Sequence, residues 1–173
     1  MTALESANPP EAPGSWPEAF VVERGGGRLA APLYVVGSDI SVKVSTRDSG
    51  GAFAVMEDCT PAQMGPPLHL HREQDEWWYI VEGQYLFEVD GREILAGPGS
   101  VVFAPAGSRH RFQNIGTTPG RSIVTVVPGG LDEFFKELSV AAPRGTVPDP
   151  ARLIPLFEKH GLELLGPPLP PRP

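Results

Sequence analysis

The sequence predicts an all-β protein built as a small double-sheet barrel or jelly roll. From about residue 20 to residue 128, short apolar runs alternate with turn residues, and helical spacing of apolar residues begins only after that point. The chain holds 20 glycines and 21 prolines among 173 residues, which favours turns over long helices. This length suits one domain whose core is large enough to be stable alone.

Alternation of apolar and polar residues predicts strands with one dry face and one wet face. It is clearest where Ile40, Val42 and Val44 are separated by polar residues. Asp90-Gly91 is the strongest hairpin signal, because the favoured two-residue turn needs positive φ at both positions. Further strands are expected at residues 52–58, 76–81, 84–90, 101–104, 109–114 and 121–127.

After residue 129 the periodicity changes from strand to helix. Two apolar stripes there have the i, i+3, i+4 spacing that places side chains on one face of a helix. Asp149-Pro150 is typical of an N-cap followed by proline, whereas Pro155 predicts either a kink or a later start of the second helix. We expect both helices to pack on the outside of the barrel. The stripes are Leu131, Phe134, Phe135 and Leu138 in the first helix and Leu153, Leu156 and Phe157 in the second.

These patterns divide the chain into four segments. Residues 1–18 are expected to form a flexible N-terminal arm, because they are rich in Pro, Glu, Ala and Ser. Residues 19–128 form the barrel, and residues 129–165 form a helical extension. Residues 166–173 form a proline-rich tail that is not expected to be regular.

Composition excludes several classes of partner. A net charge of -7 and a pI near 5.1 argue against nucleic acid and against anionic membrane surfaces. Cys59 is the single cysteine, so an internal disulfide is excluded and a reducing compartment is compatible with the chain. The sequence shows neither an apolar run long enough to cross a membrane nor a secretory signal, and we expect a cytoplasmic protein.

Three of the four histidines are spaced as metal ligands. His69 and His71 are two residues apart, so in a strand both imidazoles project from the same face. If residues 72–75 form a loop, Glu76 opens the next strand and folds back beside them. His110 would supply the fourth ligand. This set accepts one divalent transition metal, namely Fe, Ni, Mn, Co, Cu or Zn, without choosing among them.

These spacings resemble the two signature motifs of the cupin superfamily. The first runs His69-x-His71, four residues, Glu76, six residues, Gly83. The second runs Gly99, five residues, Pro105-x-Gly107, two residues, His110, three residues, Asn114. One difference is that the glycine opening the first motif, Gly65, stands two residues nearer the first histidine than usual.

Across roughly residues 40 to 165 the chain looks like single-domain, quercetinase-like (quercetin 2,3-dioxygenase-like) bacterial cupins. This resemblance implies a cupin double-stranded β-helix with His69, His71, Glu76 and His110 as metal ligands. It also implies that Glu76 acts as a catalytic base on a substrate hydroxyl. The implied reaction is dioxygenation of a flavonol-like or other small aromatic or enolic substrate, with dioxygen as the second reactant.

Two other functions remain open at this stage. A non-oxidative isomerase, lyase or hydrolase would use the same ligands without consuming oxygen. A non-catalytic cupin would bind a small molecule without turnover.

Apolar side chains on the expected inner faces predict a pocket for a flat aromatic or other apolar ligand. Trp77 and Tyr79 fall on the opposite face, where cover by the N-terminal arm or by a second subunit is expected, and we predict a homodimer. Asn114 or a backbone carbonyl is expected to orient the imidazoles, and His160 is expected to be a packing or surface residue. The predicted pocket residues are Met64, Trp78, Ile80, Tyr85, Phe87, Phe103 and Phe112.

Overall fold

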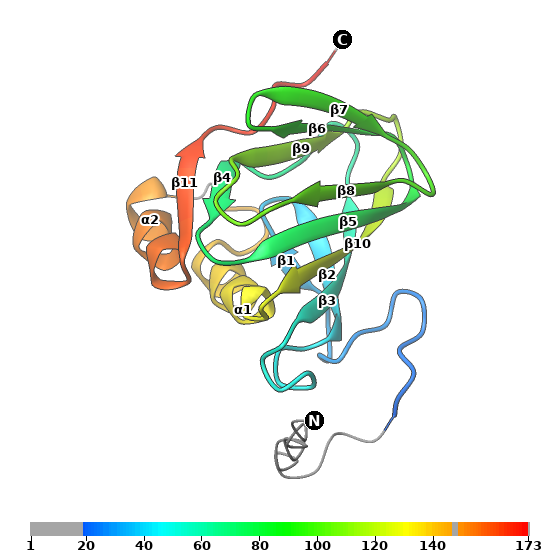
Figure 1. The fold of residues 1–173 in the computed structure, drawn as a ribbon, viewed down its shortest axis with the longest axis vertical. Coiled ribbons are helices and arrows are strands. Elements are labelled where there is room, and N and C mark those ends of the chain that lie inside the picture. Colours follow the sequence, from blue (N-terminus) through cyan, green and yellow to red (C-terminus); the bar gives the residue numbers. More distant parts are fainter. Residues whose placement is uncertain (1–18, 147–148, 173) are drawn as a thin grey trace, which may run out of the picture.

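The computed structural model describes residues 19–146 and 149–172 and confirms the predicted all-β barrel with two C-terminal helices (Figure 1). The arm predicted for residues 1–18 lies outside the described residues. Within the described part, no helix is both long and apolar enough to span a membrane.

Two antiparallel sheets face each other, which is the double-sheet arrangement of a jelly roll. The 6-stranded sheet has the order β1 (Leu33–Val35), β2 (Ser38–Val44), β3 (Ala54–Thr60), β10 (Gly120–Val127), β5 (Asp75–Glu82), β8 (Val101–Ala104). The 5-stranded sheet has the order β11 (Leu162–Gly166), β4 (Leu68–His71), β9 (His110–Asn114), β6 (Tyr85–Val89), β7 (Arg92–Ala96).

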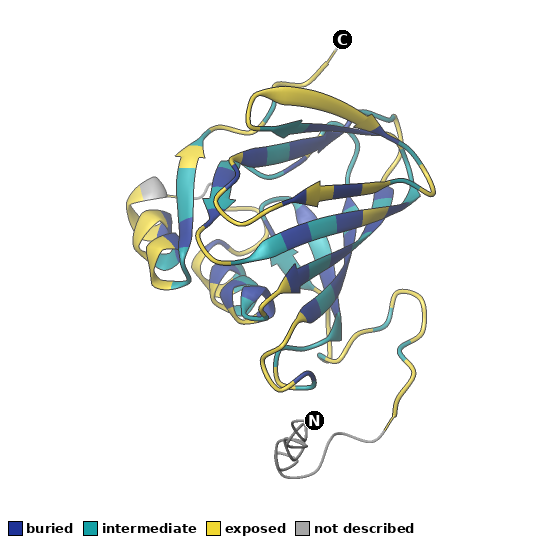
Figure 2. Ribbon diagram, viewed as in Figure 1, coloured by how far each residue is buried: buried dark blue, intermediate teal, exposed yellow. Residues whose placement is uncertain are grey.

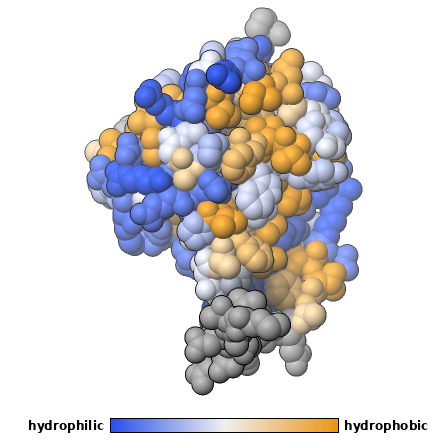
Figure 3. Space-filling model, viewed as in Figure 1, coloured by the Kyte–Doolittle hydropathy of each residue, from blue (hydrophilic) through white to orange (hydrophobic). Residues whose placement is uncertain are grey.

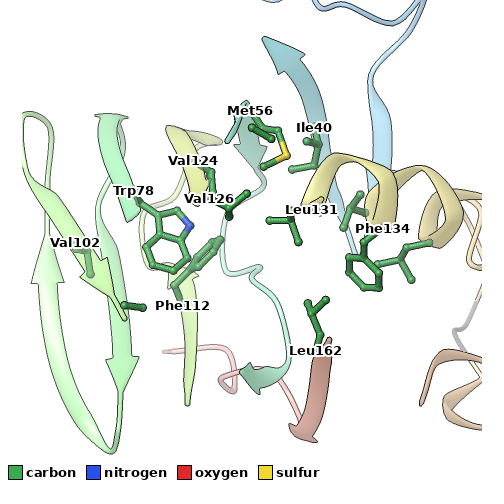
Figure 4. Close-up of a cluster of buried hydrophobic side chains, with 14 of the residues drawn as sticks. Ile40, Met56, Trp78, Val102, Phe112, Val124, Val126, Leu131, Phe134 and Leu162 are labelled. Atoms are coloured by element: carbon green, nitrogen blue, oxygen red, sulfur yellow. The ribbon is translucent and has the colours of Figure 1, made fainter. Parts of the chain in front are cut away.

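Strand β5 shows how alternation sets the faces of the barrel. Glu76, Trp78 and Ile80 are buried, whereas Trp77 is half-buried and Tyr79 is 46% exposed, as the sequence predicts. Figure 2 shows buried residues alternating with less buried ones along the strands, and Figure 4 shows buried side chains of the two sheets meeting in the interior. The barrel core is therefore built from the inward face of each sheet.

Helix α1 (Leu131–Ala141) buries the apolar stripe that the sequence predicts. Leu131, Phe134 and Leu138 are each at most 2% exposed and join the core of the barrel. Figure 4 shows Leu131 and Phe134 pointing from this helix toward the interior. The helix lies on the outside of the sheets, as predicted, but it also closes one end of the space between them.

Helix α2 (Pro150–Lys159) begins at the predicted cap. The side chain of Asp149 accepts a hydrogen bond from the backbone N–H of Ala151 at 3.0 Å. The helix continues through Pro155, so the predicted alternative of a later start is wrong. Phe157 packs edge-on against Phe134 of α1, with ring centroids 4.9 Å apart, and this contact joins the two helices.

Strand β11 was not predicted from the sequence, in which the second helix was expected to end at Gly161 and residues 166–173 to form an irregular tail. It pairs antiparallel with β4, placing Leu162 opposite His71 and Leu164 opposite His69. Three of its five residues are leucines, but so short a run has no clear strand periodicity, and pairing with β4 is what stabilises the segment as a strand. The C-terminal segment therefore supports the strand that carries two of the predicted ligands.

Candidate metal centre

The structure brings all four predicted ligands together inside the barrel. His69 and His71 project from β4, His110 from β9 of the same sheet, and Glu76 from β5 of the opposite sheet. All four side chains are buried, and one donor atom from each lies within 4.8 Å of the others. The cluster therefore joins the two sheets across the interior.

A backbone hydrogen bond links the two motif segments beside this cluster. The N–H of Gly107 donates to the carbonyl of His71 at 2.7 Å, and Gly107 has φ of 81°. A positive φ of this size favours glycine at the turn before β9. This turn holds the end of β4 next to the start of β9, so His71 and His110 are fixed relative to each other.

Each imidazole is oriented by a hydrogen bond at Nδ1. In His69 the acceptor is the carbonyl of Pro67 at 2.8 Å, and in His110 it is the carbonyl of Ser108 at 3.1 Å. In His71 the acceptor is Oε1 of Gln74 at 3.0 Å. A carbonyl oxygen only accepts, so in all three rings Nδ1 carries the proton and Nε2 presents a lone pair in the neutral form.

Gln74 was not assigned this role by the sequence analysis. Its amide orientation is fixed because Nε2 donates to the carbonyls of Pro128 at 3.1 Å and Gly129 at 2.8 Å, leaving Oε1 for His71. Gln74 lies in the loop between β4 and β5, where no periodicity indicates its direction. Its proximity to His71 in the chain was the only signal.

Asn114, in contrast, does not contact the imidazoles. Its side-chain Nδ2 donates to the carbonyls of Thr60 and Thr118, and its Oδ1 accepts from the N–H of Gly116. The expectation that Asn114 orients a histidine is therefore wrong, because its amide hydrogen-bonds instead to the end of β3 and to the loop that follows β9. The alternative expectation, a backbone carbonyl, is confirmed for His69 and His110.

The donor set fits a cation. Oε2 of Glu76 lies 3.1 Å from Nε2 of His110 and 3.4 Å from Nε2 of His71. Burial, reinforced by His110 and His71, holds the pKa of His69 well below its usual value, and burial also lowers the pKa of His71. Neutral imidazole lone pairs that face a carboxylate oxygen repel one another unless a positive charge lies between them. A metal ion supplies that charge.

A cavity lined by His69, His71 and Glu76 opens toward α1, whereas His110, the fourth donor, is not part of its lining. It holds about 70 Å³ of free space, less than the roughly 300 to 1,000 Å³ typical of pockets for drug-sized ligands. Of the predicted pocket residues, Trp78 and Phe112 line it. The cavity is also lined by residues that were not predicted from the sequence to belong to the pocket, namely Asp58 and Ser38 of the larger sheet and Leu131, Phe134, Phe135 and Leu138 of α1.

The other predicted pocket residues lie elsewhere. Ile80, Tyr85 and Phe87 are buried in the barrel core away from the cavity lining. Met64 is 43% exposed and Phe103 is 53% exposed. Phe103 faces outward because it pairs with Trp77 on the outer face of the sheet.

His160 lies outside the metal cluster. Its Nε2 is 3.2 Å from Oε1 of Glu137, and its ring centroid is 5.5 Å from that of Phe134. The expectation of a packing or surface residue is confirmed.

The fold and the site together define a small antiparallel β-barrel protein with an internal cluster of three histidines and one glutamate. Residues 55–127, which include all four donors, match the family model described as a cupin domain. The match identifies a cupin domain over this segment, which is less than half of the chain.

Known relatives match only part of this chain. Tetracenomycin polyketide synthase protein TcmJ of Streptomyces glaucescens is 32% identical over 60 residues, which is 35% of this chain and 40% of that protein. Quercetin 2,3-dioxygenase of Bacillus subtilis is 27% identical over 97 residues, 56% of this chain and 28% of the enzyme. The chain thus spans less than half the length of either relative.

A solved structure supports the fold. A predicted oxalate decarboxylase from Thermotoga maritima superimposes with a TM-score of 0.54 at 21% identity, covering 63% of this chain and 99% of the other. At this identity the likeness shows the shared barrel alone.

Proposed function

We propose that this protein is a metal-dependent dioxygenase acting on a small aromatic or enolic compound. One observation carries the proposal: three imidazole Nε2 lone pairs and one carboxylate converge inside the barrel, and three of these four side chains line a mostly apolar cavity. His69, His71, Glu76 and His110 would hold one divalent transition metal. When bound, such a metal acts as a Lewis acid on substrate oxygens and can bring dioxygen beside them.

Glu76 is the proposed proton acceptor. Its carboxylate is 4% exposed and lies at the same end of the cavity as the imidazoles. In this position it would take the proton from a substrate hydroxyl as that oxygen approaches the centre, and hold it away from water. The surrounding apolar side chains keep bulk water from competing for that proton.

The aromatic wall suits a planar substrate. Trp78 and Phe112 line the cavity, with ring centroids 6.0 Å apart, and α1 closes the opposite side (Figure 4). The limited free space favours a single-ring compound over a flavonol unless α1 moves. The match to quercetin 2,3-dioxygenase supports oxygen chemistry, and the match to a polyketide synthase protein supports a phenolic or enolic substrate.

Oxygen uptake tests this function. Metal-loaded protein would be given catechol, substituted catechols and 3-hydroxyflavone, and uptake that requires both metal and substrate is expected. Glu76→Gln should lower the rate about 100-fold or more, as loss of a general base does. Glu73→Gln changes an exposed carboxylate three residues away and serves as the matched control.

Conversion of a substrate without oxygen uptake would replace the proposal with a metal-dependent isomerase or lyase. Tight binding with neither uptake nor conversion would replace it with a binding module.

We further propose that the protein forms a homodimer through the outer face of β5 and β8. Tyr79 pairs with Val101 and Trp77 with Phe103, and three of these four are between 46% and 62% exposed. Figure 3 shows apolar side chains gathered over the face that carries these strands. Exposed apolar clusters of this kind mark association surfaces.

Sedimentation equilibrium at micromolar concentration should show a dimer. The paired substitution Tyr79→Glu and Phe103→Glu should yield a monomer with its metal retained. A wild-type monomer under these conditions would contradict the dimer.

A further inference from the structure

The apolar wall of the cavity is interrupted at one place. Apart from the donor residues His69, His71 and Glu76, the only polar side chains among the described residues that line it are Asp58 of β3 and Ser38 of β2. Both are buried, at 5% and 7% exposure. A ligand in this cavity therefore meets two polar regions, the donor cluster and the Asp58–Ser38 pair.

The register of the larger sheet gives the order of these regions. On β5, Glu76 is followed two residues later on the same face by Trp78. Trp78 is aligned through Val124 of β10 with Met56 of β3, and Asp58 comes two residues after Met56 on the inner face. The wall thus changes from acidic to apolar and back to acidic. The two carboxylates lie on opposite sides of the Trp78–Val124–Met56 row, so a planar ligand that crosses this row obliquely would have one end toward each carboxylate.

Asp58 has no ionic partner among the residues that the structure describes. Its Oδ1 accepts a hydrogen bond from Oγ1 of Thr60 at 2.9 Å. The preceding Glu57, on the outer face, pairs with Lys43 at 3.2 Å and with Arg121 at 2.9 Å. Burial, with a contribution from Glu76, raises the pKa of Asp58 to about 6, so it is largely ionised at neutral pH.

A buried carboxylate without a cation destabilises a fold. Its presence on a cavity wall indicates a compensating gain when a ligand is bound. A carboxylate accepts hydrogen bonds but cannot donate them, so the matching group on the ligand is a donor.

We propose that Asp58, assisted by Ser38, anchors the end of the substrate that lies away from the metal centre. The group it binds is a hydroxyl, and the substrate class is a phenolic or enolic compound with oxygens at one end and a further hydroxyl at the other. This assignment rests on the proposed function for the identity of the metal-binding end. Asp58 is a positioning residue and takes no part in bond breaking.

Measurements of probe binding in the absence of oxygen test the proposed contact between Asp58 and a substrate hydroxyl. Nickel-loaded protein would be titrated calorimetrically under argon with two matched pairs of probes. The short pair is 4-methylcatechol and 4-(hydroxymethyl)catechol, and the long pair is 3-hydroxyflavone and 3,7-dihydroxyflavone. In at least one pair, wild type should bind the hydroxylated member about 10-fold more tightly or better, the gain expected for a hydrogen bond to a charged group.

Asp58→Leu should bring that ratio close to one while metal content is unchanged. Asp58→Asn, which keeps an acceptor oxygen, should retain part of the preference and guards against misfolding of the Leu variant. Glu57→Gln, the neighbouring carboxyl on the outer face, should leave the ratio unaltered.

No preference in the wild type for either pair, or a preference that persists in Asp58→Leu, would overturn the anchor. Oxygen uptake with the same probes is a separate measurement. Loss of the preference in Asp58→Leu without any uptake by wild type would support the anchor and reject the dioxygenase.

Discussion

His69 lies directly opposite His110 in the antiparallel pairing of β4 with β9, and their ring centroids are 4.4 Å apart. The two sequence motifs therefore meet at one pair of residues. Because both rings are held through Nδ1 by the backbone two residues earlier, the barrel itself sets the direction of each Nε2. The site is consequently preorganised by the fold.

Gln74 should control metal affinity through His71. Gln74→Ala removes the acceptor that fixes the ring, so the affinity for Zn²⁺ or Ni²⁺ should fall about 10- to 100-fold. Competition with a chromophoric chelator measures this change. Glu73→Ala, at the exposed neighbouring position, should leave affinity as in wild type, and equal affinities in the two variants would show that the contact is unimportant.

Gly65 should not tolerate a side chain. A Cβ there would lie 1.9 Å from the carbonyl oxygen of Phe112, a backbone atom that cannot rotate away. Gly65→Ala should therefore lower the free energy of unfolding by about 2–4 kcal/mol. At Gly166 the nearest atom to a Cβ is 3.6 Å away, so Gly166→Ala is the control. Denaturant titrations that give the two variants equal stability would refute this steric reading.

Metal retention should persist at least down to the pH at which an ordinary histidine titrates. Burial lowers the pKa of His69 and His71, so both rings stay neutral below the ordinary histidine pKa of about 6.5. Bound metal adds to this effect. Metal content after dialysis between pH 5 and pH 8 should be constant down to about pH 6.5 and fall only at lower pH. Loss beginning above pH 7 would contradict it.

Asp58 should make the metal-free protein less stable as pH rises from about 4 to 6. Its pKa is about 6 when folded and about 3.9 when unfolded, so in this window the unfolded state loses the proton first and is favoured. Asp58→Asn removes the effect. The stability of the variant relative to wild type should grow by up to about 3 kcal/mol between pH 4 and pH 7.

Urea unfolding at several pH values, in the presence of a chelator, measures this difference. A difference that is independent of pH would mean that Asp58 titrates normally.

Much of the fold follows from local patterns. Alternation assigns the faces of β5, and the helical stripe of α1 is buried as its spacing predicts. The spacing of His69, His71, Glu76 and His110 predicts the metal site, because the position of a residue in a strand fixes the face to which its side chain points.

The remaining features depend on tertiary contacts. Strand β8 reads VVFA and has no polar residue to mark its face, so the outward direction of Phe103 is fixed only by its pairing with Trp77. Strand β11 needs β4 as a partner, and Gln74 acts from a loop without periodicity. Asp58 follows another acidic residue, Glu57, in β3, and only the packed barrel shows that Asp58 is the one that faces a cavity.

Metal stoichiometry tests the central claim most directly. Elemental analysis after reconstitution should find about one equivalent of transition metal in wild type and in His160→Ala, whose histidine pairs with Glu137 away from the cluster. His69→Ala and His110→Ala should each lose it while remaining folded by circular dichroism. No metal in reconstituted wild type, or full retention in both variants, would contradict the account.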